Sequence, residues 1–455
     1  MKRLASTATK AKPTPVPTPP PKAKRPKLEI PAYHLTPSAV DPETGEIIWP
    51  APRDQMSRAR DFILECVAAQ QRTLIVPDKD ADGLSSGAIL RRTLILLGLD
   101  PALISAHLMQ KGSNLQAAAE RAAMAAHKPS YIFVLDQGSG LRSPPIIEAP
   151  HRALVIDHHW AQDDTDFPEG ALHVSACRSP PVATSALLTY TICAPLHADV
   201  PKACDWLCAM GTHGDLGTSI KWEPPFPDMK PTFKTYTKTV INTAVSLINA
   251  PRRTAAYGVP GAWAALTEAD APGDLLTNPD LLAARAEVNA EVSRCSHEPP
   301  SFSSDGRIAV FRISSAAQVH NVIAMRWAGY LQSPRLEVIL VANEGYLPGM
   351  VNFSCRIPRC AKMRDPPVNL IQVLRSVVDK AESPTLRERL GESFARGHKE
   401  ASGGIVPKAE FEELMDVLRV KKKFKKTTTT TTTGKNEVPG PSNTIMNYFG
   451  KEETR

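Results

Sequence analysis

Three short apolar segments, each followed by an acidic residue, constrain the fold of this chain more than any other feature. Residues 73–77, 131–135 and 153–156 are continuous apolar runs, and segments with helical spacing, such as 57–70 and 84–97, lie between or before them. Short apolar runs that alternate with helices are typical of a parallel sheet covered on both faces. The sequence therefore predicts an α/β fold built on a parallel sheet.

The residues that follow these predicted strands are the candidates for a functional site. They are Asp78, Asp80 and Asp82, then Asp136, then Asp157 with His158 and His159. The carboxyl ends of parallel strands share one edge of a sheet, so these side chains should converge there. Clustered carboxylates repel one another unless a cation neutralises them, and a mixed Asp and His set suits Mn²⁺ or Mg²⁺. Enough acids are present for two such ions.

Asp215, in the glycine-rich segment 211–217, is a further candidate ligand. Its flanking glycines permit a tight turn that would aim the carboxylate inward. Each of these aspartates also has an ordinary explanation as a helix N-cap or a turn residue, and for Asp82 alone the N-cap is the commoner use. The ordered recurrence of acids in one setting favours the metal site.

A second alternation of strands and helices begins near Arg307 and ends in an amphipathic helix at 407–420. It predicts a second, smaller α/β domain, which helices at 233–250 and 279–296 would join to the first. The expected organisation is a disordered Pro-rich basic arm at 1–56, a first α/β domain at 57–221, a helical connector at 222–300, a second α/β domain at 301–420 and a disordered basic tail at 421–455.

The net charge of +7 is unevenly distributed along the chain. Residues 1–28 carry +8 and residues 419–455 carry +6, which leaves −7 for the residues between them. This disfavours a simple basic nucleic-acid-binding globule and suits a metal-binding body with basic attachments. A basic cluster in the arm is of the kind read as a nuclear address: Lys22, Lys24, Arg25 and Lys27.

The cysteines and the apolar runs exclude other classes of protein. The eight cysteines are scattered, and no secretory segment follows Met1, so reduced thiols of an intracellular protein are expected. No run approaches the roughly 18 apolar residues of a membrane span.

The four acidic motifs together resemble those of the DHH phosphoesterase superfamily. These motifs are the segment DKDADG at 78–83, Asp136-Gln137-Gly138, Asp157-His158-His159 and Gly214-Asp215. The form DxDxDG resembles the RecJ-like exonuclease branch, in which an aromatic residue commonly stands where this chain has Lys79. The segment INAPRR at 248–253 also resembles RecJ, with Arg253 at the matching position; an ordinary surface arginine is the alternative.

The second domain resembles the DHH-associated domain of the same superfamily. The segment RGHKEASGG at 396–404 is similar to its glycine-rich GHxxASG motif, and VNFSCRI at 351–357 is similar to its Ser-x-Arg strand. Glycines let backbone N–H groups approach phosphate, and arginine binds phosphate bidentately. The substrate-binding residues that the resemblance implies are Arg253, Asn352, Ser354, Arg356, Gly397, His398, Ser402 and Gly403.

The resemblance implies a metal-dependent phosphodiesterase, most closely a single-strand-specific exonuclease. Its catalytic residues would be Asp80, Asp82, Asp136, His158, His159 and Asp215, and its metal ligands Asp78, Asp80, Asp82, Asp136, Asp157, His158 and Asp215. Asp157 and His159 would act partly as ligands and partly to fix the orientation of the imidazole. Two alternatives stay open. One is a DHH phosphoesterase for short oligonucleotides, nucleotide bisphosphates or cyclic dinucleotides. The other is a replication scaffold that kept the fold and lost catalysis, although all the motif acids are present here.

The C-terminal segment 442–450 resembles the peptide that docks on the replication sliding clamp. Ile445, Tyr448 and Phe449 stand at positions 4, 7 and 8 of an octet that starts at Ser442, where the peptide usually has Gln. An aliphatic and two aromatic anchors of this kind plug into a pocket. The alternative is a hydrophobic terminus without a partner.

Overall fold

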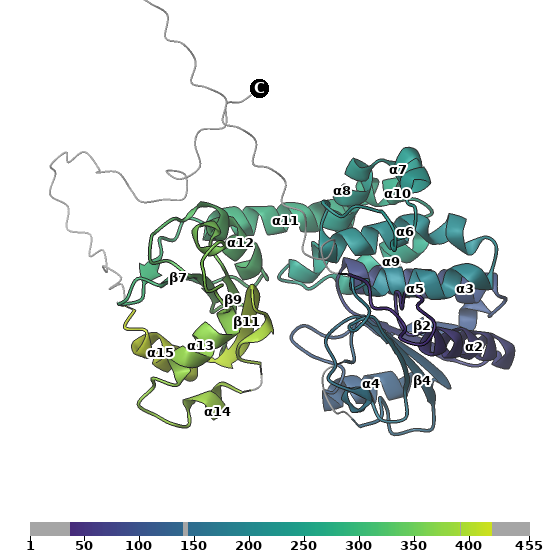
Figure 1. Ribbon diagram of the computed structural model, residues 1–455, viewed down its shortest axis with the longest axis horizontal. Helices are drawn as coiled ribbons and strands as arrows, with labels where there is room; N and C mark the ends of the chain where they lie inside the picture. The colour runs from purple at the N-terminus through teal and green to yellow at the C-terminus, as the bar shows by residue number, and fades with distance from the viewer. Residues whose placement is uncertain (1–36, 140–143, 392, 421–455) are drawn as a thin grey trace, which may run out of the picture.

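Two α/β bodies, each built around its own sheet, are joined by a long helix (Figure 1). The computed structural model describes residues 37–139, 144–391 and 393–420. Within these ranges no helix has the length and apolar character that crossing a membrane requires. All eight cysteines lie in the described residues, and each is a free thiol.

The first sheet has five parallel strands in the order β2-β1-β3-β4-β5. Their bounds are β1 Thr73–Pro77, β2 Ile104–Ala106, β3 Tyr131–Leu135, β4 Arg152–Asp157 and β5 Leu172–Ser175. Alternate residues of β1 face opposite sides: Ile75 joins one apolar cluster, while Leu74 and Val76 join another. Burial on both faces explains why the strands read as continuous apolar runs and confirms the predicted parallel sheet.

Helices cover both faces of this sheet. The helices of the first body are α2 Arg53–Ala69, α3 Ala81–Leu96, α4 Ala118–Ala126, α5 Ser185–Cys193, α6 Val200–Leu216, α7 Lys230–Tyr236, α8 Lys238–Ile248, α9 Val259–Glu268 and α10 Pro272–Thr277. The larger apolar cluster contains residues of α2, α3, α5 and α6, and the smaller one contains Met124 of α4.

The second sheet has six strands in the order β10-β11-β9-β8-β7-β6, with only β7 and β8 parallel. Its strands are β6 Ser301–Phe302, β7 Ile308–Ile313, β8 Val338–Asn343, β9 Met350–Arg356, β10 Arg396–His398 and β11 Ala401–Pro407. Its helices are α12 His320–Tyr330, α13 Leu370–Val378, α14 Leu386–Leu390 and α15 Lys408–Val417. Helices α13 and α15 pack on one face and α12 packs on the other.

Helix α11, Pro279–Cys295, contributes to both bodies, as Figure 1 shows. Leu281 near its start packs in the core of the first body, whereas Val288 and Val292 pack in a core of the second. The rest of the expected connector at 222–300 is part of the first body, because α8, α9 and α10 pack into its core. The helical part of the expected connector is thus mainly α11.

The expected boundary of the N-terminal arm is wrong for its described part. Residues 37–52 precede α2 and contact the first body, where Ala51 is buried in the core. The indole Nε1 of Trp49 donates a hydrogen bond of 2.8 Å to the carbonyl of Pro181. A Pro-rich composition had suggested an unfolded segment, but its few large apolar residues find partners far along the chain.

Loops of the two bodies touch beside the carboxyl edge of the first sheet. Lys111 Nζ, after β2, donates to the Ala316 carbonyl at 2.8 Å and lies 4.2 Å from the centre of the Tyr346 ring. The Gln318 N–H donates to the Arg253 carbonyl at 2.8 Å. The Gln318 contact places the loop between β7 and α12 next to the end of the short helix η4, Pro251–Arg253.

We predict that Gly211→Ala destabilises the first body by about 1–3 kcal/mol, because an added methyl must displace its neighbours. Gly211 lies in α6 where that helix meets α3 and α5, and a Cβ there would overlap Ala186 Cβ and lie 3.1 Å from Ser85 Cβ. Thermal unfolding of the two proteins measures the difference.

Gly273→Ala in α10 is the matched control, since a Cβ at that position has no heavy atom within 4 Å. That variant should unfold at the wild-type temperature or slightly above it. Equal melting temperatures for wild type and Gly211→Ala would contradict the close packing of these helices.

Candidate metal centre

The register of the first sheet brings three aspartates to neighbouring positions. Pro77 pairs with Leu135, and Leu135 pairs with Ile156, so Asp78, Asp136 and Asp157 each come next at the same edge. Asp136 has a left-handed backbone with φ of 63°. A non-glycine residue in this region is strained, and such strain is concentrated at functional sites.

Asp80 is the residue that caps α3. Its Oδ1 accepts hydrogen bonds from the N–H groups of Asp82 at 3.1 Å and Gly83 at 3.3 Å. Its Oδ2 lies 3.7 Å from Arg252 Nη2. Burial would raise the pKa of Asp80, but Arg252 and the Gly83 N–H outweigh it and lower that pKa. The sequence suggested that Asp82 caps a helix, but the residue that caps α3 is Asp80.

Asp82 is fully buried and points to the N-terminus of α5. The N–H of Ser185 donates to its Oδ2 at 2.7 Å and the N–H of Ala186 to its Oδ1 at 2.9 Å. Burial, and next the nearby charge of Asp215, raise the pKa of Asp82 to about 7. Burial and the Asp82 charge likewise raise the pKa of Asp136 well above its ordinary range, although Ser185 Oγ donates to Asp136 Oδ1 at 2.9 Å.

Asp157 organises the turn that carries the two histidines. Its Oδ1 accepts from the N–H of His158 at 2.8 Å and from His159 Nδ1 at 2.8 Å, and its Oδ2 accepts from the N–H of Ser139 at 2.9 Å. Burial would raise the pKa of Asp157, yet these donors hold it at about 2. Of the two roles expected for Asp157, these contacts favour the positioning of the histidines over direct metal binding.

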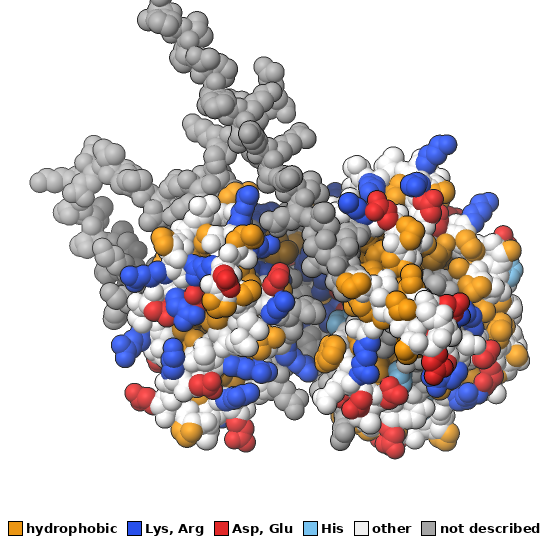
Figure 2. All heavy atoms as spheres, viewed as in Figure 1, with side chains coloured by type: hydrophobic (Ala, Val, Ile, Leu, Met, Phe, Trp, Pro, Cys, Tyr) orange, Lys and Arg blue, Asp and Glu red, His pale blue; other side chains and the backbone are white. Residues whose placement is uncertain are grey.

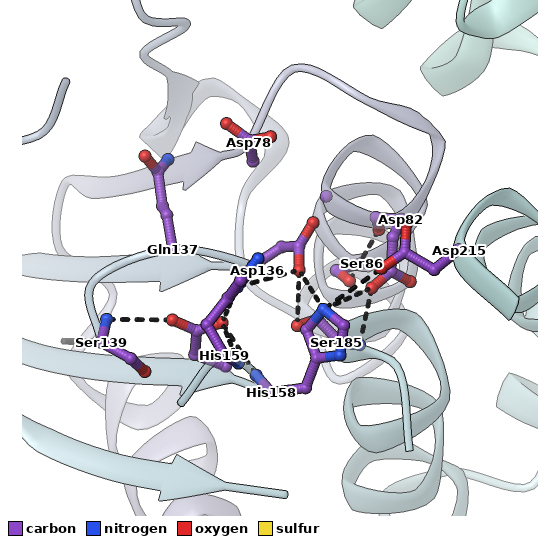
Figure 3. A network of polar contacts seen from close by, with 12 residues as sticks. Asp78, Asp82, Ser86, Asp136, Gln137, Ser139, His158, His159, Ser185 and Asp215 are labelled. Atoms are coloured by element: carbon purple, nitrogen blue, oxygen red, sulfur yellow. Dashed lines mark hydrogen bonds and ion pairs between the residues drawn. The ribbon is translucent and has the colours of Figure 1, made fainter. Parts of the chain in front are cut away.

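Asp215 lies in the last turn of α6, where the sequence had suggested a tight turn. That expectation is wrong for Asp215, because its backbone is helical and the glycine turn comes only after the helix, at Gly217 with φ of 75°. Gly211 instead serves close helix packing, since a Cβ there would lie 3.0 Å from Asp82 Oδ1. The helix still directs Asp215 at the same point as the strand-end acids, as Figure 3 shows.

His158 Nε2 is the best indicator that these residues fit a divalent cation. It lies 3.2 Å from Asp136 Oδ1, 3.3 Å from Asp215 Oδ2 and 3.9 Å from Asp82 Oδ2. This buried atom nevertheless makes no hydrogen bond. Burial would lower the pKa of His158, but the carboxylates outweigh it and raise that pKa well above the ordinary value. A nitrogen enclosed by carboxylate oxygens without a bonded partner matches the donor set of Mn²⁺ or Mg²⁺.

The convergent residues form three overlapping groups whose ligand atoms lie within 4.8 Å of one another in the described part of the chain. The groups are Asp136, His158 and His159; Asp82, His158 and Asp215; and Asp78, Asp80 and Asp136. Lys79 Nζ lies 3.5 Å from Asp78 Oδ1, so a positive charge borders the third group.

Sequence reasoning missed two residues around the metal centre, Ser185 and Arg252. Ser185 binds both Asp82 and Asp136 but lies 103 residues from Asp82, so no spacing signals it. Arg252, the neighbour of the expected Arg253, is the arginine beside Asp80, and its Nε donates to Asn249 Oδ1 at 3.1 Å. Arg253 is the next residue along the chain. Burial lowers the pKa of its guanidinium to about 10, and its Nε has no hydrogen-bond partner in the described residues. The resemblance at 248–253 thus indicated the correct segment, but the arginine beside Asp80 is Arg252 and not the predicted Arg253.

The expected residues of the second body form a separate group on β9 and the β10–β11 hairpin. Arg356 Nη1 donates to Ser354 Oγ at 3.0 Å, and Asn352 is buried on the same strand. Ser402 Oγ donates to the Arg396 carbonyl at 2.9 Å, and Gly397 pairs with Ser402 in the hairpin. A Cβ on Gly403 would overlap the Phe353 carbonyl, so close strand packing explains this glycine.

Several expected positions lie outside the described residues. They are the side chain of His398, the clamp-like residues Ile445, Tyr448 and Phe449, and the basic cluster Lys22, Lys24, Arg25 and Lys27. Clamp binding and nuclear import stay predictions.

Comparisons with solved structures give the same fold. RecJ from Thermus thermophilus in complex with Mn²⁺ is 20% identical with a TM-score of 0.56, over 82% of this chain and 55% of that one. A manganese-bound exonuclease RecJ is 18% identical with a TM-score of 0.55, over 81% and 94%. A DHH domain described as belonging to a family of ribosomal proteins is 15% identical with a TM-score of 0.53, over 81% and 92%.

This chain has the DHH phosphoesterase fold. No family model and no curated protein matches the sequence itself. The chain spans about half the length of the Thermus protein, at 55%. The DHH fold accounts for the convergence of acids from β1, β3, β4 and α6, since all four elements end at one edge of the sheet.

We predict that Mn²⁺ binds this DHH centre more tightly as the pH rises. The raised pKa values of Asp82, about 7, and of Asp136 keep protons on these groups near neutral pH, and a cation must displace them. Between about pH 6 and pH 8 the affinity should rise about tenfold or more. Titration calorimetry in buffers of different ionisation enthalpy measures both the affinity and the protons released.

Asp54→Asn, on the exposed start of α2, is the control and should titrate like the wild type. An affinity that is flat or falls with rising pH would show that the cation does not displace protons from these carboxyls.

Proposed function

We propose that this protein is a metal-dependent phosphodiesterase that degrades single-stranded nucleic acid from an end, in the manner of RecJ-like exonucleases. The observation that carries the proposal is the unbonded Nε2 of His158 among the carboxylates of Asp82, Asp136 and Asp215. The similarity to manganese-bound RecJ structures supports the choice of metal and of reaction class.

In this proposal Asp78, Asp80, Asp82, Asp136, His158 and Asp215 hold two divalent cations. When bound, such cations neutralise phosphoryl charge and lower the pKa of water. The protein supplies the geometry: α5 N–H groups fix Asp82, Ser185 fixes Asp136, and Asp157 fixes the turn of His158. Lys79 and Arg252 border the site and would attract the phosphodiester.

His159 is suited to give a proton to the leaving oxygen. Its Nδ1 donates to Asp157 Oδ1 at 2.8 Å, which leaves Nε2 for the substrate on a side chain that is 53% exposed. Burial would lower the pKa of His159, but Asp157 outweighs it and raises that pKa. As the phosphorus–oxygen bond breaks, the proton moves from Nε2 to the departing oxygen, and the charge left on that oxygen is quenched.

The surroundings of Arg356 favour a nucleic-acid substrate over a protein that only binds metal. It makes no ion pair with a carboxylate among the described residues, and its Nη1 donates only to Ser354 Oγ and to the Cys355 carbonyl. Burial lowers the pKa of its guanidinium, so an anionic partner is favoured there. A phosphate of the strand would complete its hydrogen bonds.

We predict that Asp136→Asn and Asp215→Asn each lower the rate of phosphodiester cleavage at least about 100-fold, because each removes a cation ligand. End-labelled single-stranded DNA and RNA, incubated with Mn²⁺ or Mg²⁺, report the rate, the preferred substrate and the direction together. Asp54→Asn should keep the wild-type rate. Full activity in both site variants would refute this assignment.

We predict that His159→Ala lowers kcat about 100-fold or more while Mn²⁺ affinity changes little, because the variant removes a proton donor and no principal ligand. The wild-type kcat should fall as the pH rises through the raised pKa of His159, since the donor is then lost. This alkaline decline should disappear in the variant. A variant that keeps both kcat and the decline would exclude His159 as the donor.

A further inference from the structure

A row of polar side chains leads along β9 away from the metal centre. Asn352, Ser354 and Arg356 alternate with residues of the apolar core, so all three face the side of the sheet on which α12 packs. Successive members of the row are about 6.6 Å apart along a strand. Asn352 pairs with Asn343 at the end of the sheet that carries Tyr346.

The Asn352 end of this row lies nearest to the catalytic residues. Tyr346, in the loop that follows Asn343, contacts the first body, because Lys111 Nζ lies 4.2 Å from the centre of its ring. In the neighbouring loop the Gln318 N–H donates to the carbonyl of Arg253, the residue after Arg252. Arg356 pairs with Ile339 at the opposite end of the sheet. The row therefore runs outward from the metal centre.

Two buried polar atoms, one in the row and one beside it, have no hydrogen-bond partner in the described residues. Asn352 Oδ1 and His320 Nδ1 are buried and make no hydrogen bond. His320 lies at the start of α12, and the centre of its ring lies 6.3 Å from that of Tyr346. Buried polar atoms without partners are rare, and a bound ligand would supply the missing hydrogen bonds.

Beyond Arg356 the row opens into a groove of about 640 Å³ between α12, the short helix η5 Arg359–Ala361 and the β10–β11 turn. Met325 and Met363 line it and are 52% and 89% exposed. Three cations line it against one acid, Glu400: Arg356, Arg359 and Lys362. Figure 2 shows Lys and Arg side chains on the second body, at the left of the view.

We propose that this groove binds the nucleotides of a single strand that lie beyond the one held at Arg356. The inference rests on the proposed function and extends it to a substrate of several nucleotides. Exposed methionines offer polarisable apolar contacts to base faces of any identity, and the excess positive charge suits the phosphates between the bases. The groove continues the row from the metal centre, so one strand can occupy both. A dinucleotide, by contrast, would end before the groove.

Two double variants test the groove without touching the metal centre. Arg359→Glu/Lys362→Glu reverses its charge and Met325→Ala/Met363→Ala removes its apolar surface; all four residues are exposed, so the fold should persist. The substrates are a single-stranded oligothymidylate of about 12 nucleotides and a thymidine dinucleotide, each hydrolysed with Mn²⁺ by the full chain. Lys380→Glu, an exposed residue near α13, and Leu64→Glu on α2 are the controls.

Each double variant should raise KM for the long strand about tenfold, equivalent to about 1.4 kcal/mol, and leave the dinucleotide kcat/KM within about twofold. The charge reversal should also make the salt dependence of the long-strand KM shallower, by at least about 1.4 in the slope of log affinity against log salt. The controls should match the wild type. A purely structural role would not alter the salt slope.

The outcomes separate the two claims. If the wild type hydrolyses both substrates and the variants keep its long-strand KM and salt slope, the groove does not bind the strand. If the wild type prefers the dinucleotide, the groove inference fails while the phosphodiesterase stands. If the wild type hydrolyses neither, the proposed function itself fails.

Discussion

Mutual repulsion among buried carboxylates is the constraint on which this site depends. Asp82 and Asp136 are almost fully enclosed; the charge of Asp215 adds to burial in raising the pKa of Asp82, and the charge of Asp82 does the same for Asp136. A fold retains such a cluster only when protons or cations neutralise it. The surrounding structure holds it in place through the α5 N–H groups on Asp82, the strained backbone of Asp136 and the donors around Asp157.

The parts of the fold that sequence could predict are those governed by local pattern. The strands at 73–77 and 131–135 read as continuous apolar runs because both of their faces are buried, and the acids at their ends follow from the shared edge of a parallel sheet. The helix at 279–296 and the second α/β pattern could be predicted from the local spacing of their apolar residues. The two strands and the helix at 279–296 lie within a few residues of their expected bounds.

The features of the fold and of the site that could not be predicted depend on contacts between distant segments of the chain. Asp215 reaches the site from the end of a helix, and Ser185 binds two acids with no motif to mark it. Trp49 joins a segment of Pro-rich composition to the core through Pro181. In each case tertiary packing decided the local structure, and no spacing in one sequence carries that information.

Manganese located in a crystal of the full chain by its anomalous scattering would test the central claim most directly. The account predicts manganese peaks enclosed by Asp82, Asp136, His158 and Asp215. The ligands would be carboxylate oxygens and the now unbonded Nε2 of His158. A manganese-soaked crystal with no peak among these four side chains would contradict it.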